Sequence, residues 1–535
     1  MPRIRDIFFD PSMAVARLGS SSSPQVAYEW AQTPNPRVEG ETSVRPAWSL
    51  NVLADGTVSP FMPDRVAFRD GANIRPVCPF LEVWAVLGDS DDPATWTEAP
   101  LTPALLAENG VTLSALQFVV NARNRKAERR TGLARLRYGT YPAVRVRGDE
   151  HTAVALLGRS PPGSNPRMIP AGRSIPLGSF QVLRSRAQPA PNAASWASEV
   201  NVEVVRCRLT PARGFVYGPP QTANPLPDGS VPVDSSRAFL EESAGWAGAT
   251  VNQLVEPADT FDGAENGTSG LGASMGIVDD TCEVHVEARL TLGSGVLTGR
   301  ANVFVAPPDF APDRRPFLSI ADELNDRAAG QSERSQRMSA AEVTAWVQDL
   351  FERVYETVSL TNVDYWRALR SISLPAAARR SAPIPGDAVP QPSRAGGGLD
   401  RLRNELFPVA APSGNQPLPL TEHARMRHRA LADVDQLRDF VAQNPGRLRS
   451  LVRAVFECEA AENGRATTLR MPPFMRGSNA LPLTLSAWQY DLLMRWVSNI
   501  EQGGAIADLA AEGPAPLSAG AESRRREVLD RLGEP

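Results

Sequence analysis

Apolar and polar residues alternate along short segments of the first 315 residues, and this period of two is that of β-strands with one buried face. Three segments show it most clearly: 143–147, 200–207 and 282–290. In the last of them Val and Ala share one face, and Glu and His share the other. Pro and Gly interrupt the segments at short intervals. The pattern predicts a large antiparallel β-rich region with long connections.

After Pro316 the period of the apolar positions changes from 2 to 3.6, which is typical of helices. Ser339 and Glu342 form a capping-box pattern, and an apolar stripe behind them predicts a helix over 340–358. Similar patterns predict helices over 421–443, 447–460 and 484–499. The fold class expected is therefore α+β, with a β-rich N-terminal region followed by a mostly helical C-terminal region.

The same patterns divide the chain into five parts. Residues 1–315 are the β-rich region and 316–373 a first helical region. Residues 374–400 are rich in Pro, Gly and Ala, which indicates a linker or loop. A second helical region covers 401–502, and a Gly/Ala/Pro-rich tail covers 503–535.

Composition excludes several classes of protein. The chain has 535 residues, 22% of them charged, and a formal net charge of −4. That balance gives no overall basic field for nucleic acid, so no nucleic-acid partner is expected. No run approaches 18 apolar residues, so no membrane partner is expected either. The N-terminus lacks the apolar core of a secretory signal, which favours a cytoplasmic location, with non-classical export as the alternative.

Arginine supplies every basic residue except one, because Lys126 is the only lysine in the chain. Codon bias is the plainer interpretation of this preference. Lys126 lies within a local basic cluster, which either meets an acidic partner or forms a solvated face balanced by acids elsewhere. The cluster contains Arg123, Arg125, Lys126, Arg129, Arg130, Arg135 and Arg137.

Generic motifs of catalysis and metal binding give no active site. The four cysteines, at 78, 207, 282 and 458, lie far apart and form no C-x-x-C pair. His423 and His428 are five residues apart, about 140° round a helix, so they would not share a metal ion. No metal site is expected.

Five short strings, taken together, resemble one known family. They are 10–19 (DPSMAVARLG), 68–80 (FRDGANIRPVCPF), 278–280 (VDD), 305–312 (VAPPDFAP) and 471–496, which ends in LTLSAWQYDLLMRW. In this order they resemble the family of L-lysine ε-oxidase and glycine oxidase. Enzymes of that family carry cysteine tryptophylquinone, a cofactor built from their own Cys and Trp.

The resemblance implies an oxidase that converts a small amine or amino acid, with O₂ and water, into a carbonyl compound, ammonia and H₂O₂. It implies a quinone cofactor to accept the substrate's electrons and a carboxylate base to take the α-proton. The residues that match the family's motifs are Arg17, Gly19, Arg69, Asp70, Asp279, Asp280, Asp309, Gln489 and Tyr490.

The sequence also departs from the family. The residues Thr281-Cys282-Glu283-Val284 stand where Asp-Gly-Pro-Val is expected, and Ser478 stands where an aspartate is expected. No counterpart is found for the cofactor's cysteine, its aspartate or its tryptophan. The cofactor would then need a C-terminal part or a partner chain that this sequence does not supply. The fallback is a cross-link of Cys458 with Trp488 or Trp496, and the alternative is that these three are core residues of packed helices.

Each candidate acid has a structural alternative. Asp309 is either an active-site acid or the residue that pins a Pro-locked turn. Arg69 and Asp70 fit a turn with a local ion pair. Asp279 and Asp280 either bind a cation or lie in a solvent-exposed turn.

Two functions therefore stay open. One is a quinone-dependent amine or amino-acid oxidase. The other is a non-catalytic family member that acts as a binding or assembly subunit, as a homo-oligomer or with a partner protein.

Overall fold

The structure is a computed structural model. It describes residues 3–32, 42–184, 200–226, 229–249, 264–265, 272–293, 295–309, 311–319, 322, 338–360, 434–452, 475–476, 481–482 and 485–503.

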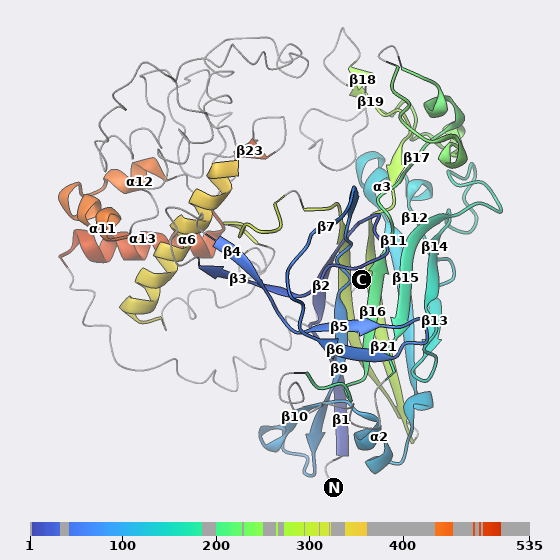
Figure 1. Cartoon of the computed structure of the whole chain (residues 1–535), viewed down its shortest axis with the longest axis horizontal. Helices are drawn as coiled ribbons and strands as arrows, with labels where there is room; N and C mark the ends of the chain where they lie inside the picture. The colour runs from blue at the N-terminus through green and yellow to red at the C-terminus, as the bar shows by residue number, and fades with distance from the viewer. Residues whose placement is uncertain are drawn as a thin grey trace.

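Two six-stranded sheets form the centre of the strand-rich part of the described chain (Figure 1). The first has the order β1-β9-β16-β15-β14, with β10 also paired to β9; its strands are β1 (Arg3–Asp10), β9 (Phe80–Gly88), β10 (Thr97–Pro100), β14 (Val154–Gly158), β15 (Ile175–Val182) and β16 (Arg206–Pro211). The second has the order β12-β11-β21-β22-β2, with β13 also paired to β11; its strands are β2 (Met13–Arg17), β11 (Leu116–Asn124), β12 (Tyr138–Gly139), β13 (Val144–Arg147), β21 (Cys282–Leu292) and β22 (Gly295–Ala306). The pairing is antiparallel except between β2 and β22, which run parallel.

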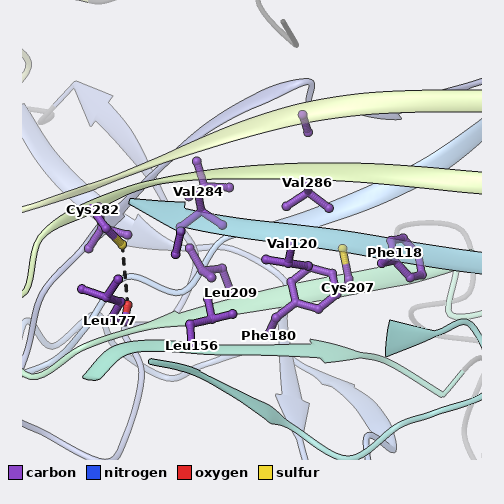
Figure 2. Close-up of a cluster of buried hydrophobic side chains, with 14 of the residues drawn as sticks. Phe118, Val120, Leu156, Leu177, Phe180, Cys207, Leu209, Cys282, Val284 and Val286 are labelled. Carbon is purple, nitrogen blue, oxygen red and sulfur yellow. Dashed lines mark hydrogen bonds between the residues drawn. The ribbon is translucent and has the colours of Figure 1, made fainter. Parts of the chain in front are cut away.

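The main core lies between these sheets. Figure 2 shows side chains of β11 and β21 pointing toward those of β14, β15 and β16. Phe118 and Phe180 meet there with ring centroids 5.7 Å apart, and both are fully buried. Alternation in β11 and β21 supplies one half of this core, because every second residue points to the same face.

The sheets also approach each other at their edges. A side chain at Gly299 of β22 would meet the backbone of Ile7 and Phe8 of β1 at 3.0 Å. At the opposite edge Gly139 of β12 and Arg159, next to β14, exchange backbone hydrogen bonds of 3.0 and 2.8 Å. The two sheets therefore enclose one apolar interior.

Short two-stranded sheets are present in addition to the two large sheets. They are β3 (Tyr28–Gln32) with β4 (Thr42–Pro46), β5 (Ser49–Val52) with β6 (Val58–Phe61), β7 (Arg69–Asp70) with β8 (Asn73–Ile74), β17 (Val216–Tyr217) with β20 (Val278–Asp279), β18 (Ala264–Glu265) with β19 (Gly272–Ala273), and β23 (Met475–Arg476) with β24 (Leu481–Pro482). Two short helices, α2 (Pro103–Glu108) and α3 (Lys126–Thr131), lie within the strand-rich part.

The longer helices all follow residue 339, and Figure 1 shows them grouped on the left of the view. They are α6 (Ala340–Leu360), α11 (Val434–Gln443) and α13 (Ala487–Glu501), with the short α12 (Arg447–Leu451) beside them. Their apolar faces form a second buried cluster that includes Phe351, Leu437 and Leu493. Among the described residues, no helix combines the length and the apolar character that crossing a bilayer requires.

Most predicted elements within the described residues are confirmed. Strand β21 covers 282–290 with the expected buried face, β13 covers 144–147, and α6 covers 340–358. The capping box is present, because Glu342 N–H donates to Ser339 Oγ at 3.2 Å and Ser339 N–H to Glu342 Oε2 at 2.7 Å.

Three boundaries were predicted wrongly. The helix expected over 447–460 ends at Leu451, and Val452 after it has an extended backbone. The strand expected over 200–207 begins only at Arg206, because Asn201 Oδ1 accepts the N–H of Glu203 at 3.0 Å and turns the chain. Val202 and Val204 of that segment are buried nonetheless. Helix α13 begins at Ala487 rather than 484, because Ser486 caps it.

Other predicted segments lie partly or wholly outside the described residues. These are 374–400, 421–433, 453–460 and 504–535. The domain boundaries drawn from the sequence stay predictions.

Candidate functional site

Four of the five family-like strings meet at the end of β2. We call this place the β2 junction and define it as residues 17–21, 70–77, 214–215, 279–281 and 306–309. Contacts between segments far apart in the chain build it. The candidate residues Arg17, Gly19, Asp70, Asp279, Asp280 and Asp309 lie here, and Arg69 precedes Asp70 in β7.

Arg17 ties the first string to two others. Its backbone exchanges hydrogen bonds with Val77, at 3.2 and 3.1 Å. Its guanidinium donates to the carbonyl of Pro307 at 3.1 Å and lies 3.6 Å from the carboxylate of Asp309. Both side chains of this ion pair are partly exposed, so the pair adds little to the stability of the fold and mainly orients Arg17 and Asp309 relative to each other.

Asp309 also accepts the N–H of Ala311 at 3.0 Å. This is the turn geometry of the structural alternative for Asp309, which is thereby confirmed. The tie to Arg17 holds that turn against the end of β2.

Gly19 is fitted closely against the second string. A side chain there would lie 2.5 Å from Pro76 N, 2.6 Å from Ile74 O and 2.8 Å from Arg75 C, all backbone atoms. Two residues on, Ser21 Oγ donates to Asp70 at 3.0 Å. Arg69 and Asp70 form the short strand β7, and the predicted turn follows them at Gly71, which has φ +60°. The Asp70 carboxylate accepts the Ser21 hydroxyl.

Asp279 is the centre of a polar cluster at the start of β21. Its Oδ1 accepts hydrogen bonds from Asn124 Nδ2 at 3.0 Å and Thr281 Oγ1 at 2.7 Å. Its Oδ2 lies 2.6 Å from Lys126 Nζ, and its carbonyl oxygen accepts the hydroxyl of Tyr138. Burial, together with the negative charges of Asp279 and Asp280, raises the pKa of Tyr138 well above its ordinary value.

Asn124 positions the residues of this cluster through hydrogen bonds. Its Oδ1 accepts the backbone N–H of Lys126 at 3.0 Å, while its Nδ2 also reaches Thr281 O at 2.9 Å. One buried amide therefore fixes both partners of the Lys126–Asp279 ion pair. Sequence reasoning missed Asn124, Lys126 and Tyr138 as members of a site; the single lysine was the available signal.

Asp280 is buried, with only 1% of its surface exposed. Its Oδ2 accepts the N–H groups of Phe215 and Gly214, at 2.9 and 3.1 Å. Burial raises its pKa to about 6; the two backbone hydrogen bonds oppose the shift, and the charge of Asp279 adds to it. The expectation of a solvent-exposed turn was wrong for Asp280, because the 214–215 turn covers it.

The turn that covers Asp280 touches the first string. A side chain at Gly214 would lie 3.6 Å from Leu18 Cβ, and Leu18 N–H donates to Ala306 O at 2.9 Å. Gly214 has φ +85°, which favours glycine and lets two successive N–H groups face one carboxylate oxygen.

The basic cluster around Lys126 is largely paired with acids. Arg125 and Arg137 lie 3.0 and 3.7 Å from Glu128, and Arg129 pairs with Glu283. These contacts favour a solvated face balanced by acids over a surface for an acidic partner.

Gln489 and Tyr490, from the fifth string, lie in the helical cluster. Gln489 is fully buried, accepts the N–H of Ser486 at 3.1 Å and donates to Phe317 O at 3.0 Å. Tyr490 packs against the same cluster. Both residues position α13 and the segment that follows β22.

The described residues do not fit a cysteine tryptophylquinone. Cys207 and Cys282 are buried between the sheets. The thiol of Cys207 faces the carbonyl of Leu81, and the thiol of Cys282 faces the carbonyl of Leu177 (Figure 2). Burial raises the pKa of the described thiols, that of Cys78 to about 11, which disfavours the reactive thiolate.

The fallback tryptophans are helical-cluster residues. Trp496 is almost fully buried and donates to Thr344 Oγ1 at 3.3 Å, so the core alternative is confirmed for it. Trp488 is half-buried and lies against Trp346, with ring centroids 5.2 Å apart. Cys458 lies outside the described residues.

Within the described ranges, no group of three or more His, Cys, Asp or Glu side chains is placed to hold a metal ion. Comparison with known proteins adds no assignment: no family model matches the chain, and no curated protein matches it. The family resemblance therefore stays a hypothesis.

Proposed function

We propose that this chain is built on the scaffold of the L-lysine ε-oxidase and glycine oxidase family and acts as a non-catalytic binding or assembly subunit. The meeting of four family-like strings at the β2 junction supports the shared scaffold. The observation that carries the non-catalytic role is the burial of Cys207 and Cys282 between the sheets, which raises the pKa of both thiols and disfavours their reactive thiolate form.

The first experiment measures whether the full chain carries a cofactor. The intact mass of the purified chain is expected to equal the mass of its unmodified sequence, and a quinone stain is expected to be negative. Incubation with a panel of amino acids and simple amines is expected to release no H₂O₂. Robust peroxide formation by this chain alone would overturn the proposal.

The assembly role has its own readout. Size-exclusion chromatography with light scattering is expected to give a stable homo-oligomer, or a complex when a partner protein is co-purified. A strictly monomeric chain with no partner would contradict it, whatever the mass shows.

A second function is favoured by one observation, the half-buried Trp488 in contact with Trp346. In this alternative the chain is an amine or amino-acid oxidase, and Cys458 supplies the sulfur of the cross-link. The net reaction would convert an amine, O₂ and water into a carbonyl compound, ammonia and H₂O₂. Its test is Cys458→Ser, which would abolish both a mass change and peroxide release, while Cys78→Ser would keep them.

A further inference from the structure

The β20–β21 corner holds a carboxylate whose two oxygens have different surroundings. Oδ2 of Asp280 accepts two backbone hydrogen bonds, from Gly214 and Phe215. Oδ1 is equally buried, and within the part of the chain that the structure describes it has no hydrogen-bond partner. An unpaired buried oxygen is costly when it is charged and much less costly when it carries a proton.

Among the described residues, no cationic side chain is paired with Asp280. Asp279, on β20, is negatively charged and already paired with Lys126 of α3. Tyr138 of β12, Tyr217 of β17 and Cys282 of β21 also contribute to the local electrostatics. Burial raises the pKa of Tyr217 to about 12 and those of the other two further above their ordinary values, so all three stay neutral through physiological pH.

Opening of the Gly214–Phe215 turn would expose the buried Asp280 carboxylate to water. Asp280 binds the Gly214–Phe215 turn, and that turn lies next to Leu18 at the end of β2, since a side chain at Gly214 would come within 3.6 Å of Leu18 Cβ. If the turn opens, the carboxylate reaches water and recovers the ordinary affinity of aspartate for a proton. Opening is therefore coupled to ionisation of Asp280.

We propose that Asp280 is a proton-dependent latch on the β2 junction. With its carboxyl group protonated, Asp280 stays buried and the Gly214–Phe215 turn is closed. With the carboxylate ionised, the turn opens more often and exposes the end of β2. The latch is thus closed in acid and loosened at neutral pH.

The size of the effect follows from proton linkage. A carboxyl group with a pKa of about 6 when closed and 3.8 when open shifts the opening equilibrium by about a hundredfold over the full titration. Between pH 5 and pH 7.5 the expected change is about tenfold, because in the open state, where its pKa is 3.8, Asp280 is already ionised at pH 5.

Hydrogen exchange of the full chain, followed by mass spectrometry, tests the latch. Peptides that cover residues 206–217 are expected to lose about tenfold in protection between pH 5 and pH 7.5, after correction for the intrinsic exchange rates. In Asp280→Asn, which keeps an oxygen for the two N–H groups and cannot ionise, the change is expected to vanish.

Asp234→Asn is the matched control. Asp234 is an exposed aspartate that accepts the N–H of Ser236, so its removal should leave the tenfold change intact. Retention of the pH dependence in Asp280→Asn would overturn the proposal. Should that variant not fold, a wild-type pH series still decides: a protection change without a midpoint near pH 6 is incompatible with the latch.

Discussion

Lys126 shows why one position keeps lysine in a chain that otherwise uses arginine. Its partner Asp279 offers a single free oxygen, because Oδ1 is occupied by Asn124 and Thr281. A guanidinium binds best to two oxygens at once, whereas an ammonium group is a compact point donor. The geometry therefore suits lysine at this position.

Replacing Lys126 by Met should lower the free energy of unfolding by about 1–3 kcal/mol, because Asp279 loses its counter-charge in a partly buried place. Lys126→Arg should fall between the wild type and Lys126→Met. Urea unfolding followed by circular dichroism measures both.

Arg125→Met is the comparison for this effect. Arg125 pairs with Glu128 on the same short helix but is more exposed. Its loss should change the free energy of unfolding by less than about 0.5–1 kcal/mol. Equal effects at 125 and 126 would mean that the Lys126–Asp279 pair has no special place in the fold.

Gly19 gives a second prediction at this scale. Gly19→Ala would drive a methyl group into the backbone of residues 74–76, which cannot move aside as a side chain would. The expected loss is about 1–3 kcal/mol or more. Gly295→Ala, where the nearest atom is Leu292 O at 3.7 Å, should be nearly neutral in the same urea unfolding assay.

The residue scale also shows what local sequence could and could not indicate. Gly19 and Arg17 belong to a recognisable string, so they were candidates from the start. Nothing in the spacing links Lys126 to Asp279, 153 positions away. That contact depends on the register of β11 against β21, which places Arg123 opposite Glu283.

Among the elements, the alternation of apolar and polar residues predicted strands well where no nearby side chain forms a hydrogen bond with the strand's backbone. Strand β21 alternates over its length and was predicted almost completely. The 200–205 segment alternates as well, but the Asn201 side chain captures a backbone N–H and makes a turn. Side-chain capping of this kind leaves no trace in the hydrophobic pattern.

The prediction for helix α13 concerns the replacement of Gln489. It joins the capping box with Ser486 to the carbonyl of Phe317, so it fixes the helix against the segment that follows β22. Gln489→Leu should lower the free energy of unfolding of the helical cluster by about 1–3 kcal/mol, because these buried hydrogen bonds are lost.

Tyr490→Phe is the neighbouring control, since it removes only a hydroxyl group from a half-buried ring. Its unfolding midpoint should stay within the error of the wild type. A Gln489→Leu chain as stable as Tyr490→Phe would show that packing alone holds α13 in place.

For the whole molecule, the division into a strand-rich part and later helices was visible in the sequence, but the sheet order was not. The order β1-β9-β16-β15-β14 joins strands separated by more than a hundred residues. Such pairing depends on which apolar faces fit together between the sheets. Every strand has the same period of two, so the period does not indicate which strands pair. The β2 junction was unpredictable for the same reason.

The dependence of stability on pH is the prediction at this scale. Asp280 binds its proton more tightly in the folded chain, with a pKa of about 6, than in the unfolded chain, near 3.8. Between these values the folded chain holds more protons, so the free energy of unfolding falls as pH rises. The contribution is complete below about pH 4 and is lost as pH rises through 6. From pH 5 to pH 8 it should decrease by about 1–2 kcal/mol.

Urea unfolding of the wild type and of Asp280→Asn at several pH values isolates this contribution. Carboxylates with a lowered pKa do not interfere. At Glu287, for example, partial burial opposes ionisation but Arg289 and Arg300 outweigh it, so this group is charged in both states above pH 5. The histidines are common to both chains and cancel in the difference. The difference between the two curves should therefore change by about 1–2 kcal/mol between pH 5 and pH 8, with its midpoint near pH 6. Parallel curves would show that Asp280 is not protonated in the folded chain, and both the buried-charge argument and the latch built on it would fail together.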